Sequence, residues 1–180
     1  MYNIFLPGTV IEENKPGCAN DVAREILKLK KENIEGVILD LRFNGGGSIQ
    51  EALDLAGIFI DAGPICMLND RSAKPMALKD MNRGIAWDGP LMLLVNSSSA
   101  SASEIIAAAM QDYNRALIVG QTTYGKSTGQ IVLPCDTTLL PDLSNLEITK
   151  KSEGFVKMTS LKLYRIDGSS HQKTGVVPDL

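Results

Sequence analysis

Short apolar runs that end in turns of small residues, each followed by a helical pattern, constrain the fold of this chain more than any other feature. Gly36–Leu41 (GVILDL) leads into Asn44–Gly47, and Pro90–Val95 (PLMLLV) leads into a serine-rich turn before the alanine-rich segment Ser101–Tyr113. A short apolar run bounded by turn signals is typical of a strand buried on both faces. The repetition of strand and helix predicts an α/β fold, with helices packed against a largely parallel sheet.

The remaining segments continue this alternation. Apolar residues at helical spacing predict helices over Asp21–Asn33 and Ile49–Phe59. Residues 69–88 are polar and weakly patterned, and residues 136–154 form a long polar insertion. The length of 180 residues fits a single domain, residues 1–180. Further strands are predicted at Asn3–Val10, Pro64–Leu68, Ala116–Gly120, Gln130–Leu133 and Phe155–Ile166.

Composition argues against several classes of function. The formal charge of −3 leaves no basic footprint for nucleic acid, and no apolar run approaches membrane-spanning length. The first ten residues lack the pattern of a signal peptide. The three cysteines show no CxxC spacing, so neither a disulfide framework nor a metal site is expected. The single histidine, His171, lies in a polar stretch and is predicted to be a surface residue.

One alternative function comes from a nucleotide-binding pattern. Gly120–Ser127 (GQTTYGKS) matches GxxxxGK[ST], and Val37–Asp40 resembles an apolar run that ends in a magnesium-binding aspartate, so a P-loop nucleotide hydrolase is a legitimate hypothesis. A phosphate loop works only if a helix begins at its Lys-Ser step. Here Thr128–Pro134 contains glycine, apolar residues and proline, which favour a turn and a strand. The aspartate also precedes the loop, in the reverse of the usual order.

Two segments contain residues suited to nucleophilic catalysis. Ser101, at the start of a predicted helix, gains the positive end of the helix dipole, and backbone N–H groups nearby can stabilise an oxyanion. The spacing Ser101-x-x-Glu104 is also a capping box, in which the serine only caps the helix. Lys126 follows a tight, mostly uncharged stretch, where burial would disfavour its ammonium form and let it accept a proton. The alternative for Lys126 is a solvated surface charge.

Four ordered motifs give the chain a family resemblance. They are Asp40–Gly47 (DLRFNGGG), Ser99–Ile105 (SASASEI), Gly120–Gln130, and Gly175–Asp179 (GVVPD). Together they resemble the carboxy-terminal processing (tail-specific) peptidases, the S41 family, from about residue 36 to the end. The resemblance implies an α/β fold of the crotonase/Clp-protease-like type, a spiral of ββα units.

The resemblance also implies a catalytic role for individual residues. The middle serine of the SASASE motif is the family's nucleophile, which here is Ser101. The family's base lysine falls on Lys126, and the glutamine that orients it falls on Gln130. On an extended segment, a four-residue step keeps Lys126 and Gln130 on the same face. The reaction implied is cleavage of a peptide bond near the C-terminus of a protein or peptide substrate, with no metal and no cofactor.

The oxyanion hole implied by the resemblance uses two backbone N–H groups. One belongs to Ala102, directly after the nucleophile. The other belongs to Gly46 or Gly47, because family members often have proline, which has no N–H, at the first glycine of this turn. Asp112, another recurrent family position, is expected to support the end of its helix or to pair with Arg115.

Some family features are missing from the sequence. Members usually carry a PDZ domain, a leader segment and flanking helical regions, and none is recognisable here, so we expect residues 1–180 to be an isolated catalytic core. The bacterial members suggest a periplasmic or cell-envelope location. Extended substrate is expected to add to a sheet edge near the site. A non-enzymatic ligand-binding module on the same fold is the main alternative.

Overall fold

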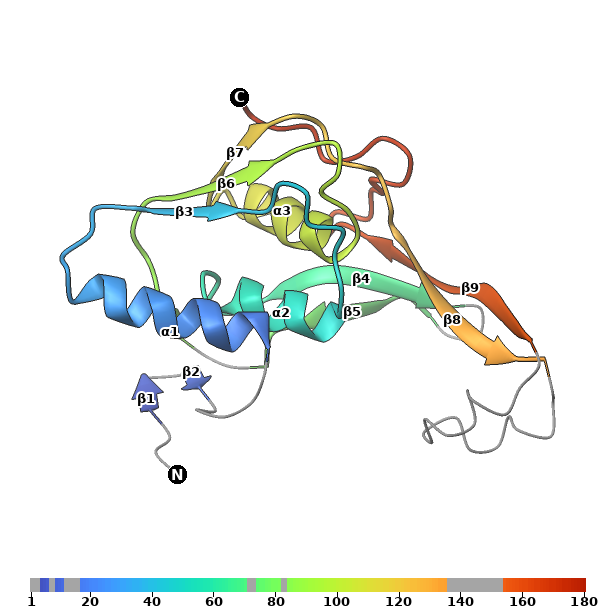
Figure 1. The fold of residues 1–180 in the computed structure, drawn as a ribbon, viewed down its shortest axis with the longest axis horizontal. Helices are drawn as coiled ribbons and strands as arrows, with labels where there is room; N and C mark the ends of the chain where they lie inside the picture. The colour runs from blue at the N-terminus through green and yellow to red at the C-terminus, as the bar shows by residue number, and fades with distance from the viewer. Residues whose placement is uncertain (1–3, 7–8, 12–16, 71–73, 82–83, 136–153) are drawn as a thin grey trace.

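The computed structural model describes residues 4–6, 9–11, 17–70, 74–81, 84–135 and 154–180. Helices and strands alternate over most of this part of the chain (Figure 1). In chain order the elements are β1 (Ile4–Leu6), β2 (Thr9–Ile11), α1 (Cys18–Lys30), β3 (Val37–Asp40), α2 (Ile49–Gly57), β4 (Pro64–Asp70), β5 (Met76–Lys79), β6 (Leu91–Val95), α3 (Ala102–Asp112), β7 (Leu117–Gly120), β8 (Thr128–Pro134) and β9 (Phe155–Tyr164).

One sheet of the molecule is parallel and has three strands, in the order β3-β6-β7. All three strands lie within segments predicted from their apolar runs. In β6, Leu91, Leu93 and Val95 are buried, while the alternate residues Met92 and Leu94 are only half-buried. Because the strands are parallel, the turns that follow β3 and β6 leave the sheet at the same edge. The turn after β3 (residues 44–47, the glycine turn) therefore lies beside the turn after β6 (residues 96–101, the serine turn).

The second sheet is antiparallel, in the order β5-β4-β9-β8. The alternation of strands and helices predicted a largely parallel sheet, so this layer differs from expectation. Strand β5 lies within the weakly patterned residues 69–88 and was not predicted. The long hairpin of β8 and β9 extends away from the three helices (Figure 1). The insertion predicted at residues 136–154 lies outside the described residues, except for Gly154 at its end.

The N-terminal prediction is wrong in its topology. The single strand expected at Asn3–Val10 is replaced by two short antiparallel strands, β1 and β2, with Ile4 opposite Ile11. This pairing places β1 and β2 in a sheet of their own, apart from the two larger ones.

Helix α3 is the centre of the core. Every residue from Ala102 to Met110 is buried, which explains why this helix is apolar on most sides. It packs against β4, β7 and α2, and α2 packs in turn against α1 (Figure 1). Helix α1 is amphipathic and buries Ala19, Ala23 and Ile26, which lie on one face. The nucleophile candidate therefore stands at the first turn of the best-packed element.

No helix among the described residues is long and apolar enough to cross a membrane.

Candidate active site

Ser101 occupies the sharp turn between β6 and α3, as the N-cap residue of the helix. Its backbone has φ 58° and ψ −115°, a left-handed conformation that costs a non-glycine residue on the order of 1–3 kcal/mol. Strained strand-to-helix turns present the nucleophilic serine in other α/β enzymes. The side chain is half-buried, and its hydroxyl donates to no residue in the described part of the chain.

The other two serines of the SASASE motif have structural roles. The Ser99 hydroxyl is fully buried and donates to the Leu41 carbonyl at 2.8 Å, and the Ser103 hydroxyl donates to the Asn44 carbonyl at 3.1 Å. The N–H of Ala100 donates to the same Asn44 carbonyl at 3.0 Å. These bonds join the serine turn to the glycine turn, and they leave Ser101 as the serine of the motif available for chemistry.

The glycine turn, residues 44–47, lies against Ser101. Gly46 has φ +91°, and a Cβ atom at this position would lie 2.5 Å from the Ala100 carbonyl oxygen and 2.7 Å from the Ala102 nitrogen. Only glycine permits so close an approach. Of the three oxyanion donors predicted from the sequence, Gly46 already donates its N–H to the Asn44 side chain at 2.9 Å. The N–H groups of Ala102 and Gly47 have no acceptor among the residues described.

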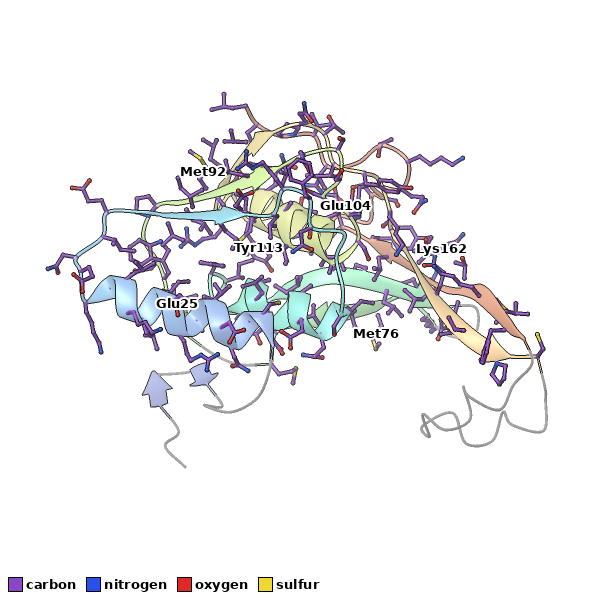
Figure 2. All side chains as sticks on the ribbon, in the orientation of Figure 1. Glu25, Met76, Met92, Glu104, Tyr113 and Lys162 are labelled. Carbon is purple, nitrogen blue, oxygen red and sulfur yellow. The ribbon has the colours of Figure 1, made fainter. Side chains whose placement is uncertain are left out.

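Glu104 connects the predicted nucleophile, Ser101, to the predicted base, Lys126. Its carboxylate is completely buried in the first turn of α3, where Figure 2 labels it. One oxygen accepts from the backbone N–H groups of Ser101 at 2.9 Å and Lys126 at 2.8 Å. The other accepts from the Thr123 hydroxyl at 2.5 Å and the Gly125 N–H at 2.7 Å. Because the Ser101 and Lys126 nitrogens are each one hydrogen bond from the same atom, they lie within about 6 Å of each other.

The capping box predicted from the sequence is therefore only part of the role of Glu104. The side chain does reach back to the Ser101 N–H, as a capping glutamate would. It makes three further bonds to the segment before β8, and no spacing rule in the sequence predicts them. An acid in the first turn of an otherwise apolar helix was the available signal, since a buried carboxylate must find donors.

Lys126 lies just before β8 rather than in it. Its side chain is half-buried, and within the described chain its amine has no hydrogen bond to Ser101 or Gln130. Strand β8 follows Lys126 after one residue, so the helix that a phosphate-binding loop requires is not there. The nucleotide-hydrolase alternative thus loses its structural basis.

Gln130 lies on the other side of an irregularity in β8. The register with β9 shifts between Gly129 and Gln130, so the simple alternation assumed for Lys126 and Gln130 is interrupted. The Gln130 amide donates to the Thr128 hydroxyl at 3.0 Å and contacts the Thr159 hydroxyl at 3.5 Å. The structure thus brings Ser101 and Lys126 to one place, and it leaves the Gln130 amide on neighbouring threonines.

His171 is not the surface residue predicted from its polar neighbours. It is only 4% exposed, and both ring nitrogens lack a hydrogen-bond partner of ordinary geometry among the described residues. Burial lowers the pKa of His171, because it disfavours the imidazolium, while the nearby carboxylate of Glu104 acts in the opposite direction. The polar neighbours in sequence therefore do not decide the position of the ring, which is buried near the Glu104 carboxylate and the Lys126 backbone.

Asp112 supports the end of α3, as predicted, but its partner is not Arg115. The Asp112 carboxylate pairs with Arg165, whose Nε lies 2.9 Å from Oδ1. Arg115 donates instead to the carbonyl oxygens of Phe59 at 3.0 Å and Trp87 at 2.7 Å. Sequence proximity favoured Arg115, whereas the fold brings the segment after β9 to the helix end.

Two of the three cysteines, Cys18 and Cys66, are poor candidates for a competing nucleophile. All three are free thiols. Burial raises the pKa of Cys66 to about 11, and burial together with the adjacent Glu51 carboxylate raises the pKa of Cys18. A raised pKa keeps a thiol protonated and unreactive near neutral pH. The described residues also contain no group of three side chains suited to hold a metal ion.

A cavity of about 340 Å³ opens beside the candidate oxyanion donors and includes Gly47 and Ala102 in its lining. Its walls are largely apolar, with Leu39, Leu55 and Ile106 contributing side chains from β3, α2 and α3. A cavity of this kind suits an apolar side chain.

Comparisons with known proteins agree on one family. Residues 10–180 match the model of peptidase family S41. A tail-specific protease of Haemophilus influenzae is 39% identical over 164 residues, which cover 91% of this chain and 23% of the relative. Carboxyl-terminal-processing peptidase 2, chloroplastic, of Arabidopsis thaliana is 36% identical, with 89% of this chain and 29% of the relative covered. This chain thus spans less than a third of either relative.

Solved structures show the same fold. The photosystem II D1 C-terminal processing protease superposes with a TM-score of 0.72 at 28% identity, covering 90% of this chain and 38% of that one. Mature CPAF complexed with lactacystin gives a TM-score of 0.71 at 14% identity, covering 93% and 43% of the two chains. The arrangement of sheets and helices is therefore the ββα spiral expected from the sequence.

Proposed function

The chain belongs to peptidase family S41, and on that premise we propose that it is the catalytic part of a serine peptidase in which Ser101 is the nucleophile and Lys126 the general base. One observation carries the proposal: the Glu104 carboxylate binds the backbone N–H groups of both Ser101 and Lys126. A single buried side chain thereby holds the turn of the nucleophile against the loop of the base.

The proposed reaction follows the usual course of acyl transfer. The Ser101 hydroxyl attacks the carbonyl carbon of the scissile peptide bond, and the neutral amine of Lys126 takes its proton. The tetrahedral intermediate collapses as Lys126 returns the proton to the leaving amine. Water then attacks the acyl-enzyme with Lys126 again as base, which releases the new C-terminus and frees Ser101.

The oxyanion is assigned to two backbone donors. Ala102 and Gly47 have N–H groups without a competing acceptor in the described structure, whereas the N–H of Gly46 is bound to Asn44. We therefore favour Ala102 with Gly47 as donors and give Gly46 a steric role. Removing one such donor typically costs about 10²–10³ in kcat. Gln130 remains the proposed third member: its Oε1 would accept a hydrogen bond from the Lys126 amine, while its NH₂ group donates to the Thr128 hydroxyl.

The proposed substrate is the C-terminal region of a protein chain, by analogy with the printed names of the relatives. Strand β8 is the edge strand of its sheet and begins two residues after Lys126. An extended peptide can add to this edge by β-augmentation, which delivers its backbone to the nucleophile. The apolar cavity beside Ala102 would then receive an apolar side chain from the residue at the cleavage point.

Two substitutions test the assignment. In the full-length protein, Ser101→Ala and Lys126→Ala should each abolish peptide cleavage, because one removes the attacking oxygen and the other the proton acceptor. The matched controls are Ser98→Ala and Lys79→Ala, both at exposed positions away from these contacts. A fluorophosphonate probe should label the wild-type protein at Ser101. Cleavage retained by either active-site variant would overturn the assignment of Ser101 and Lys126. No labelling, together with tight binding of a lipophilic ligand, would instead favour a non-enzymatic binding module.

A further inference from the structure

The segment that follows β9 contacts the chain on both sides of Lys126. The backbone N–H of Lys173 donates to the Gly125 carbonyl at 2.8 Å. The side chain of Gln172 accepts a hydrogen bond from the Ser127 N–H through Oε1 at 2.7 Å. Both residues directly adjacent to Lys126 in sequence are thus held by residues almost fifty positions later.

Lys126 lies at the centre of a short backbone stretch that is anchored mainly by side chains. The N–H groups of Gly125 and Lys126 donate to Glu104, and the N–H of the next residue, Ser127, donates to Gln172. Three consecutive amides are therefore fixed by side-chain oxygens before the regular ladder of β8 begins at Thr128.

The contact of Gln172 differs from that of Glu104 in its surroundings. Gln172 is exposed and Glu104 is completely buried. Ser127 is itself 1% exposed, and its hydroxyl donates to the Leu163 carbonyl at 2.6 Å. Core packing therefore holds the Ser127 side chain, while its backbone N–H is bound by an exposed side chain that can be changed without opening the core.

We propose that Gln172 is a positioning residue for Lys126, acting through the backbone N–H of Ser127. This inference rests on the proposed role of Lys126 as the general base. The loss of the Gln172 acceptor would allow the peptide between Lys126 and Ser127 to rotate, which would move the lysine side chain relative to the Ser101 hydroxyl. Catalysis by a positioned base is sensitive to displacements of about 1 Å, which can cost on the order of 10²-fold in rate.

Two substitutions of Gln172 separate positioning from simple loss of a residue. In the full-length protein, Gln172→Ala should lower kcat at least tenfold with little change in KM. Gln172→Glu keeps an oxygen acceptor for the Ser127 N–H and should recover most of kcat. Its added negative charge favours the charged form of the lysine amine, so the rise of kcat/KM with pH should move to higher pH. Gln50→Ala, an exposed glutamine bound to Asp54 on α2, is the matched control.

Amide hydrogen exchange gives a second readout that does not depend on activity. The Ser127 amide should exchange faster in Gln172→Ala than in the wild type, and Gln172→Glu should restore its protection. An unchanged kcat in Gln172→Ala, or unchanged protection at Ser127 in that variant, would overturn the positioning role. A failure of the proposed function would look different from a failure of this inference. If Lys126 were not the base, Lys126→Ala would retain cleavage, whatever the effect of the Gln172 variants.

Discussion

At the scale of single residues, Glu104 makes the contacts on which the site depends most. Its two oxygens accept four hydrogen bonds from the turn of the nucleophile and the loop of the base, and no water is needed to satisfy them. A buried carboxylate is tolerated only when donors surround it in this way.

Replacing Glu104 with glutamine should destabilise the protein. The amide has one acceptor oxygen, and its NH₂ group would face two N–H or O–H donors of the present network. We expect Glu104→Gln to lower the free energy of unfolding by about 3 kcal/mol, because buried donors would lose their acceptors. Urea denaturation measures this, with Glu25→Gln, which removes an exposed ion pair with Lys28, as the control expected to change stability by less than about 1 kcal/mol. Equal stability of the two variants would contradict the role given to Glu104.

The sequence predicted some of these residues better than others. Ser101 and Lys126 were found by motif, and the fold brings their backbones together. One of the four contacts of Glu104, to the Ser101 N–H, was foreseen as part of a capping box. The burial of His171 was not, because its sequence neighbours are polar and its burial depends on α3 and the loop before β8, which are distant in sequence.

At the scale of elements, the end of α3 is fastened to the segment after β9. The Asp112 and Arg165 side chains are 10% and 19% exposed, so the ion pair that they form is largely shielded from water. Arg165 also donates to the Gln111 side chain at 3.1 Å. This contact joins α3, the helix that begins after Ser101, to the end of β9, the strand that pairs with β8.

Removing one member of this pair should cost more than removing both. Arg165→Met leaves a mostly buried carboxylate without its cation, and we expect the free energy of unfolding to fall by about 2 kcal/mol after allowing for partial exposure. The double variant Asp112→Asn/Arg165→Met should recover part of this loss, since no unpaired charge is left. A double-mutant cycle in urea measures the coupling, and a coupling below about 0.5 kcal/mol would contradict it.

Element boundaries were predictable where the apolar pattern was strong. The runs at β3, β6 and β7 gave strands within one residue of those observed. Strand β5 (MALK) was missed because it is short and largely exposed. Its sequence does not mark it as a strand, and its strand conformation comes from pairing with β4. The irregularity between Gly129 and Gln130 was also invisible, since a bulge is set by the partner strand.

At the scale of the whole molecule, the single histidine sets a pH dependence. Burial holds the pKa of His171 below its ordinary value, so the unfolded chain binds a proton more readily than the folded one. Arg165 also disfavours the charged ring, while Glu104 and Asp112 favour it. Stability should therefore be fully present above about pH 6.5 and decrease as the pH falls through the value of the unfolded chain.

The histidine contribution can be isolated because the chain contains one histidine and few other side chains titrate between pH 5 and 7. We expect the melting temperature of the wild type to fall over this range and that of His171→Leu to fall less. The loss in free energy cannot exceed about 1.4 kcal/mol per pH unit for one proton. Thermal denaturation at a series of pH values measures both proteins, and parallel curves would refute the assignment.

The shared carboxylate has an evolutionary consequence. Since one glutamate ties the SASASE turn to the segment that carries the lysine, neither piece can be exchanged alone between relatives unless the incoming piece meets that acid in the same way. Hybrids that swap only one of the two pieces should recover function less often than hybrids that inherit both from one parent.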